Sequence, residues 1–149
     1  MTAHAPADHP RPLHLRVSSI ALVAVGGAIG TAAREGLTLA LPVVASIPLA
    51  ILVANLIGAF LLGLLLEALI RADATAPTAT RLRLFAGTGA LGGFTTYSAL
   101  ATDTALLLAS GTTMGTGALY ACATVVFGGL ATWAGIVVGA RRTAAGGAR

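Results

Sequence analysis

The chain consists of long apolar stretches divided by short polar segments. Uncharged and mostly apolar residues run from Val17 to Ala33, from Gly36 to Leu66, from Leu84 to Thr102 and from Thr104 to Ala140. A helix needs about 20 predominantly apolar residues to cross a bilayer. The pattern therefore predicts four membrane-spanning helices, at about residues 17–40, 43–69, 84–109 and 114–140.

The polar segments predict where these helices end. Residues 1–16, which contain three His and three Pro, are expected to be a disordered tail, and residues 141–149 a basic tail. Residues 71–83 and 110–117 are predicted to be polar connections, and Pro48 to mark the start of the second helix proper. A single four-helix domain, residues 17–140, lies between the tails.

Composition agrees with a membrane location. Only 9% of the residues are charged and 56% are hydrophobic, whereas a soluble domain has about a quarter charged residues. We therefore predict an all-α membrane protein surrounded by the lipid bilayer. The chain is basic, but no basic patch is interleaved with aromatic residues, so we expect no nucleic-acid partner. We expect no enzyme either, because no nucleophile–base pair is recognisable and all three His lie in the N-terminal tail.

Arginine predicts the orientation. With four helices, the N-terminal tail, the connection at 71–83 and the C-terminal tail share one side of the membrane, and the only Arg away from that side is Arg34. Because positive charge stays on the cytoplasmic side, both termini are predicted to be cytoplasmic and the protein to lie in the cell membrane. The Arg on that side are Arg11, Arg16, Arg71, Arg81, Arg83, Arg141, Arg142 and Arg149.

Glycine spacing predicts close helix packing. Gly26 and Gly30 are one helical turn apart, as are Gly135 and Gly139. Small residues at this spacing let helices approach closely in lipid. Four small helices enclose little space, so we also expect an oligomer.

Several polar side chains fall deep within the predicted helices. Asn55 lies near the middle of the second, and Tyr120 and Thr124 share a face of the last. Ser98 and Thr102 share a face of the third in the same way. Each of these groups either hydrogen-bonds within the protein or lines a pathway.

The third predicted helix contains an unfavourable segment. Gly92 and Gly93 precede Phe94, Thr95 and Thr96, and two glycines followed by β-branched residues favour non-helical backbone. We expect the helix to break within this segment. Carbonyl groups freed there need a partner, and a monovalent cation is one candidate.

Two charged residues lie at similar predicted depth. At about 1.5 Å per residue, Arg34 lies ~25 Å and Asp103 ~28 Å from the cytoplasmic side. We consider an ion pair between them. The alternatives are that each side chain extends to water, or that Arg34 pairs with the adjacent Glu35.

Four features of the sequence resemble one known family. They are GGAIGTAAR (Gly26 to Arg34), IPLAILVANLIGAFLLG (Ile47 to Gly63), GTGALGGFTTYS (Gly87 to Ser98) and the pair Tyr120 and Thr124. Together they are similar to the Fluc (CrcB-like) fluoride channels, over about residues 17–140.

The resemblance implies a dimer of antiparallel subunits with two fluoride pathways along its interface. It also implies a structural sodium ion (Na⁺) at the centre, held by backbone carbonyls that match Gly92 and Thr95 in both subunits. The pore-lining positions it implies are Asn55, Tyr97, Ser98, Leu100, Tyr120 and Thr124.

The chain departs from the family at two of these positions. The family motif normally has two Phe three residues apart, where this chain has Tyr97 and Leu100. The positive edge of an aromatic ring can face an anion, and Leu100 has no such edge. We therefore expect the pathway formed by this subunit's own third helix to be altered or lost.

The uneven distribution of Arg between the two sides of the membrane predicts the topology of the partner subunit. A chain with nearly all its Arg on one side inserts in one orientation, so an antiparallel dimer requires a homologous subunit of opposite topology. We favour this heterodimer over a homodimer.

The alternative function is a small four-helix ion-coupled multidrug exporter, which needs a carboxylate deep in the membrane. Glu35, Glu67 and Asp103 all lie near the ends of the predicted helices.

Overall fold

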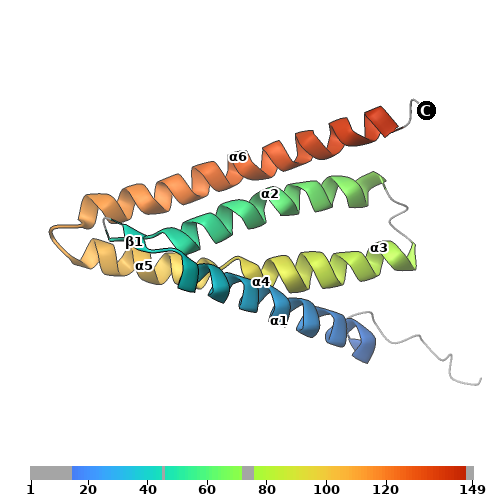
Figure 1. Ribbon diagram of the computed structural model, residues 1–149, viewed down its shortest axis with the longest axis horizontal. Coiled ribbons are helices and arrows are strands. Elements are labelled where there is room, and N and C mark those ends of the chain that lie inside the picture. Colours follow the sequence, from blue (N-terminus) through green and yellow to red (C-terminus); the bar gives the residue numbers. More distant parts are fainter. Residues whose placement is uncertain (1–14, 45, 72–75, 147–149) are drawn as a thin grey trace, which may run out of the picture.

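The computed structural model describes residues 15–44, 46–71 and 76–146, and it shows an elongated bundle of helices (Figure 1). Three helices are long and apolar enough to cross a membrane: α1 (Val17–Ala40), α2 (Leu49–Arg71) and the Met114–Arg141 part of α6 (Met114–Gly146). The bounds of α1 are those predicted from the apolar pattern.

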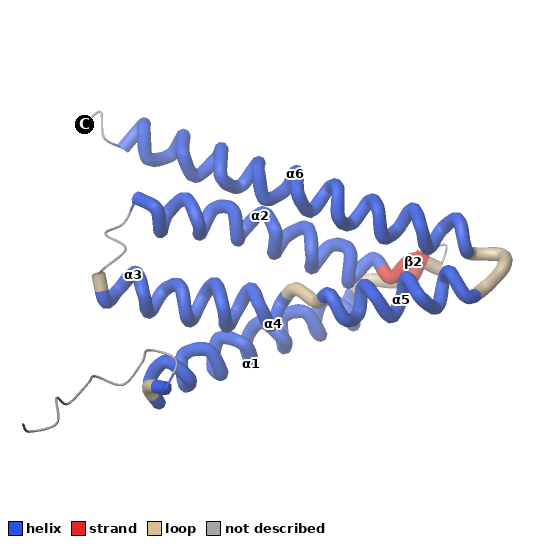
Figure 2. The backbone as a smooth tube through the Cα atoms, turned by 180° about the vertical axis from the view of Figure 1, so that it is seen from behind, coloured by secondary structure: helices blue, strands red, loops and turns tan. Residues whose placement is uncertain are grey.

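A fourth segment of the bundle is helical but interrupted. It consists of α3 (Pro77–Leu82), the π-helix η2 (Arg83–Leu91), α4 (Gly92–Phe94) and α5 (Tyr97–Ala109). These pieces follow one another along the length of the bundle, and a loop separates α4 from α5 near the middle of the segment (Figure 2).

The two ends of the bundle differ in their connections. Two short antiparallel strands, β1 (Val43–Val44) and β2 (Ile47–Pro48), lie at one end together with the turn between α5 and α6. The second helix was predicted from residue 43, but it begins at Leu49, because Pro48 disfavours helical backbone in the residue before it. Pro48 therefore marks the start of α2, as predicted.

The opposite end of the bundle carries most of the positive charge. There α1 and α3 begin and α2 and α6 end (Figure 1). Arg16 precedes α1, Arg71 ends α2, and Arg81 and Arg83 lie in the first turns of the interrupted segment. The predicted grouping of Arg is thus confirmed for these residues, and Arg11 and Arg149 lie outside the described ranges.

Helix α1 packs against η2 and α4 through glycine. A Cβ atom added to Gly26 would collide with the carbonyl oxygen of Phe85, and one added to Gly30 with that of Ala90. The predicted role of these glycines in close packing is confirmed.

Helix α2 packs against α6 by the same means. A Cβ atom at Gly63 would collide with the carbonyl of Thr132, and one at Gly135 with the carbonyl of Phe60. At Gly139 a Cβ atom would lie 3.0 Å from Cβ of Glu67. The bundle therefore consists of two closely packed pairs, α1 with η2–α4 and α2 with α6.

The break in the third helix lies within the predicted segment, at the two threonines and not at the two glycines. Gly92 is helical, with φ −63° and ψ −34°, and the extended residues are Thr95 (φ −81°, ψ 156°) and Thr96 (φ −151°, ψ 114°). Gly93 has a packing role, because a Cβ atom there would lie 3.0 Å from Cα of Gly27 and closer still to its carbonyl oxygen.

The polar segments also differ from the prediction. Helix α2 continues through Arg71 and α3 begins at Pro77, a residue well suited to the first helical position. The predicted loop at 71–83 is therefore much shorter. Helix α6 extends to Gly146, into the predicted tail at 141–149. The predicted tail at 1–16 lies almost entirely outside the described residues.

The two glycines of α4 offer a matched test of this packing. A Cβ atom at Gly92 meets nothing nearer than the carbonyl of Gly87, at 3.9 Å, whereas one at Gly93 collides with the backbone of α1. Gly93→Ala should lower the free energy of unfolding by about 1–3 kcal/mol, the usual cost of overpacking. Gly92→Ala should be neutral or stabilising, because Ala favours helix. Thermal unfolding in detergent measures both, and equal effects would contradict the assignment.

Candidate functional site

The break at Thr95 and Thr96 is bridged by one side chain from α2. The backbone N–H of Thr96 donates to Oδ1 of Asn55 at 2.8 Å, and Nδ2 of Asn55 donates to the carbonyl of Thr96 at 3.2 Å. A single amide thus supplies both the acceptor and the donor that Thr96 lacks outside a helix.

The two threonines satisfy further groups at the break. The N–H and the hydroxyl of Thr95 both donate to the carbonyl of Leu91, each at 2.9 Å. The hydroxyl of Thr96 accepts the N–H of Ala99 at 3.2 Å, which caps the start of α5. The sequence Thr95-Thr96 therefore ends one helix and begins the next.

Helix α1 contributes a third set of contacts. Nε of Arg34 and the hydroxyl of Thr31 both donate to the carbonyl of Gly93, each at 3.4 Å. This carbonyl would bond the N–H of Tyr97 if the helix were continuous. Arg34 therefore helps to satisfy backbone that the break exposes.

The intrachain ion pair between Arg34 and Asp103 is not formed. Among the residues that the structure describes, the ion pair present joins Arg71 and Glu67, one turn apart in α2. Helix α1 packs against η2 and α4, whereas Asp103 lies on α5. The prediction rested on depth alone, whereas the Arg34 side chain reaches the carbonyl of Gly93 on α4.

The break also leaves carbonyl oxygens available. Within the described parts of the chain, no hydrogen bond engages the carbonyl of Gly92 or of Thr95. Both residues line a cavity of about 280 Å³, together with Asn55 and Gly58. Unengaged carbonyl oxygens are the ligands that bind Na⁺ at interrupted membrane helices, so the predicted sodium ligands fit such an ion.

A second cavity of about 280 Å³ lies against the same bridge. Asn55, Tyr97, Leu100 and Thr124 all line it. Four of the predicted pore-lining residues are thus brought together. The Asn55 amide has two N–H groups, and its bond to Thr96 uses one of them. Asn55 borders both cavities.

Tyr97 and Leu100 occupy different environments. Tyr97 is 82% exposed. Leu100 is buried against Ile51, Leu107 and Tyr120. Ser98, also predicted in the pore, is exposed, and its hydroxyl lies 3.1 Å from that of Thr96.

The predicted polar face of α6 is buried. The hydroxyl of Thr124 donates to the carbonyl of Tyr120 in its own helix, at 2.7 Å. The hydroxyl of Tyr120 is buried without a hydrogen-bond partner among the described residues, as is that of Thr104 on α5. Such groups can donate to a molecule outside the chain. Sequence analysis missed Thr104, which no motif distinguishes from other helical threonines.

Comparison with known proteins gives the relationship directly. The sequence profile described as "CrcB-like protein, Camphor Resistance (CrcB)" matches residues 21–136. The chain belongs to this CrcB-like family. Membership, together with three helices apolar enough to cross a bilayer, makes it a multi-pass membrane protein, and the resemblance found in the sequence is confirmed.

Named relatives of the CrcB-like family are similar along most of their length. The chain is 53% identical over 130 residues to "Fluoride-specific ion channel FluC 2" of Leifsonia xyli subsp. xyli, covering 87% of this chain and 88% of that protein. It is 39% identical over 121 residues to "Fluoride-specific ion channel FluC" of Chlorobium phaeobacteroides, covering 80% and 91%. The break, its bridging amide and the glycine contacts with α1 all lie within the matched region.

The bridge predicts a local effect of removing Asn55. Asn55→Ala deletes both hydrogen bonds to Thr96, and losing the partner of a buried polar group costs about 1–3 kcal/mol. We expect faster hydrogen exchange at the N–H groups of Thr96 and the first turn of α5, measured by mass spectrometry. Thr38→Ala is the control, because that hydroxyl bonds only the carbonyl of Arg34 in its own helix. Unchanged exchange in Asn55→Ala would show that the bridge does not hold the break.

Proposed function

We propose that this chain is a subunit of a fluoride-selective ion channel that lets cytoplasmic fluoride leave the cell passively, down its gradient. The observation that carries the proposal is similarity over most of the chain to proteins named fluoride-specific ion channels. The chain has an interrupted third segment, which the Asn55 amide bridges. In this role it is a channel rather than an enzyme.

The chemistry of the site suits a small, strongly hydrated anion. Such an ion must exchange its water shell for other donors but must also be able to leave. The cavity against Tyr97 is lined by neutral side chains, and Asn55 retains one N–H group to offer. The buried hydroxyls of Tyr120 and Thr104 are further donors near α5 and α6. Neutral donors attract an anion without trapping it.

We also propose that residues 77–109 form the fourth membrane crossing. Helix α5 alone has 13 residues, fewer than the roughly 20 that a crossing requires. Joined to α3, η2 and α4, it runs along the bundle beside the long helices (Figure 1). Four crossings put both termini on the Arg-rich side, which is then cytoplasmic in the cell membrane.

The exposure of Tyr97 supports a dimer. Its side chain is 82% exposed in a single chain, directly after the break in the interrupted segment. A phenol at that level is better placed against a second subunit than against lipid tails. The partner would be antiparallel, so that two pathways form along the interface. It would be a homologous subunit of opposite topology, because this chain's Arg lie almost all at one end.

A sodium ion at the centre of the dimer forms part of this proposal. The carbonyls of Gly92 and Thr95 are its ligands in each subunit, and neither is engaged elsewhere among the described residues. The ion would satisfy backbone freed by the break. Because these ligands are backbone oxygens, binding of the ion requires no particular side chain at Gly92 or Thr95.

The multidrug exporter is less well supported. Proton or ion coupling requires a carboxylate deep in the membrane. Glu67 pairs with Arg71 near the end of α2, and Glu35 is exposed on α1. The named relatives also favour the channel.

Fluoride flux tests the function and the pairing together. We expect efflux from proteoliposomes, followed with a fluoride electrode, when the chain is co-purified with a homologous subunit of opposite Arg bias. Asn55→Ala should reduce this flux by more than about tenfold, since tenfold corresponds to 1.36 kcal/mol in the barrier. A pH gradient should drive no uptake of a lipophilic cation. Absent efflux from folded, inserted protein would refute the channel, and efflux of equal rate from this chain alone would refute the heterodimer.

Sodium removal tests the central ion. A ligand at a hundred times its dissociation constant stabilises a folded protein by about 2.7 kcal/mol. The purified dimer should therefore unfold at a higher temperature in sodium chloride than in N-methyl-D-glucamine chloride of equal ionic strength. Thr95→Ala should retain the difference, because only its carbonyl binds. An unfolding temperature that is independent of the cation would argue against the ion.

A further inference from the structure

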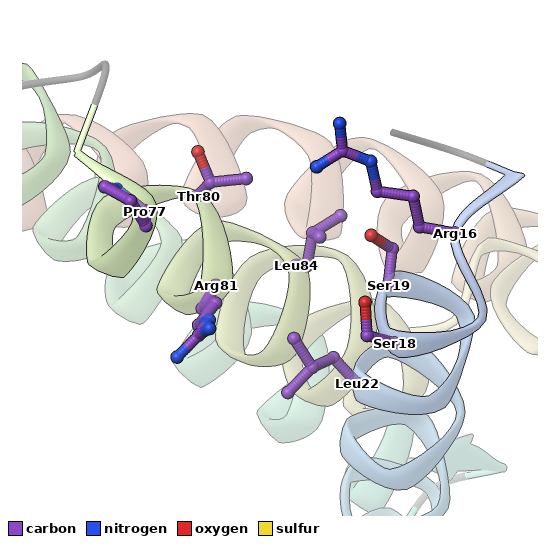
Figure 3. Close-up of a pocket in the computed structure, with 8 residues that line it drawn as sticks. All are labelled: Arg16, Ser18, Ser19, Leu22, Pro77, Thr80, Arg81 and Leu84. Carbon is purple, nitrogen blue, oxygen red and sulfur yellow. The ribbon is translucent and has the colours of Figure 1, made fainter. Parts of the chain in front are cut away.

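The cavities of the chain differ in the hydrogen-bond donors that they bring together. A cavity of about 550 Å³ lies at the Arg-rich end of the bundle, between the start of α1 and the segment formed by α3 and η2. Figure 3 shows the Arg81 guanidinium directed away from that of Arg16, so the two do not converge on one ligand. The cavity at the break that Asn55 and Tyr97 line has a different set of donors.

Most polar side chains that line this cavity at the break already have a hydrogen-bond partner. The hydroxyls of Thr95 and Thr124 each donate to the carbonyl four residues earlier, at 2.9 and 2.7 Å. The hydroxyl of Thr96 accepts the N–H of Ala99 at 3.2 Å and lies 3.1 Å from the hydroxyl of Ser98. These three threonine hydroxyls are therefore engaged within the chain.

Two side-chain donors that line the cavity remain uncommitted. Asn55 uses one of its two N–H groups on the carbonyl of Thr96 and keeps the other. The phenol hydroxyl of Tyr97 makes no hydrogen bond to any residue that the structure describes. The remaining lining residues have no polar side-chain atom: Leu100, Val125 and Gly128.

We propose that the hydroxyl of Tyr97 is the second side-chain donor to fluoride in this cavity, beside the free N–H of Asn55. The inference rests on the proposed channel function and names a residue that determines its specificity. Tyr97 is 82% exposed in the single chain, so its phenol lies at the open side of the cavity, where a second subunit would cover it. The hydroxyl there replaces part of the water shell of the anion with one directed donor.

The hydroxyl gives Tyr97 a different role from that of an aromatic ring alone. A ring presents only its weakly positive edge to an anion, whereas an O–H group forms a strong hydrogen bond to a charged acceptor. Leu100 lines the same cavity three residues later and offers neither. The pathway formed by this subunit's third helix is thus altered rather than lost, because Tyr97 supplies a donor that Leu100 cannot.

Single-channel recording of the dimer in planar bilayers tests the assignment. The dimer is the chain co-purified with a homologous subunit of opposite Arg bias, and its two pathways should give two separate current levels. Tyr97→Phe removes the hydroxyl and keeps the ring. For at least one level we expect the fluoride concentration at half-maximal current to rise by about tenfold or more, because a hydrogen bond to a charged group is lost. The maximal current of that level should not fall, because a more weakly held ion leaves more easily.

Thr102→Val is the matched control. It also removes one hydroxyl from α5, at an exposed position that lines neither cavity beside Asn55. Its half-maximal fluoride concentration should equal that of the unaltered chain. The unfolding temperature of Tyr97→Phe should also be unchanged, since the hydroxyl bonds no other described residue.

Three results would overturn the proposal. Unchanged fluoride dependence in Tyr97→Phe, with loss of current in Tyr97→Leu, would assign the anion contact to the ring. A lower unfolding temperature of Tyr97→Phe with unchanged fluoride dependence would assign the hydroxyl to the contact between subunits. Equal effects in Thr102→Val would show that no specific donor had been removed. Absence of fluoride current from the unaltered dimer would refute the channel function and this inference with it, so the two failures are distinguishable.

Discussion

Inside a bilayer, a backbone N–H or carbonyl group without a partner costs several kcal/mol, and the arrangement around Thr96 follows from meeting that requirement. Asn55 supplies a donor and an acceptor to this one residue. Arg34 and Thr31 satisfy the carbonyl of Gly93 just before it. Helices α1 and α2 are thereby fixed relative to the interrupted segment, and the two cavities beside Asn55 lie between α2, that segment and α6.

Close contacts at glycine residues also hold the helices together. They join α1 to η2 and α4, and α2 to α6, so closely that backbone meets backbone. Helix α1 makes less contact with α2 than with η2 and α4. The hydrogen bonds at the break and the packing of α5 against α6 therefore connect two pairs of helices that are each packed internally. Burial of apolar surface contributes little to this assembly, because the surrounding lipid is as apolar as the side chains.

Most of the fold could be predicted from the sequence, because charged residues bound the apolar stretches. Helix α1 has its predicted bounds, and the glycine pairs pack as expected. A break between Gly92 and Thr96 was predictable from these residue types, but the residues at which it falls were not. What decides its position is Asn55, which is distant in sequence and whose bonds to Thr96 no local pattern shows. In the same way, the partner of Arg34 was not predictable from its depth along α1, because its Nε donates to the carbonyl of Gly93 and not to a carboxylate.

The interruption has a consequence for biosynthesis. The second half of the segment is too short to enter a bilayer as a spanning helix by itself, since α5 has 13 residues. Synthesis proceeds from the N-terminus, so Thr31, Arg34 and Asn55 have all left the ribosome before Thr96 does. The side chains of α1 and α2 that stabilise the break thus precede it along the chain. Helix α6, which pairs with α2, is translated last. The backbone at the break is therefore made after the α1 and α2 side chains that bond to it and before α6.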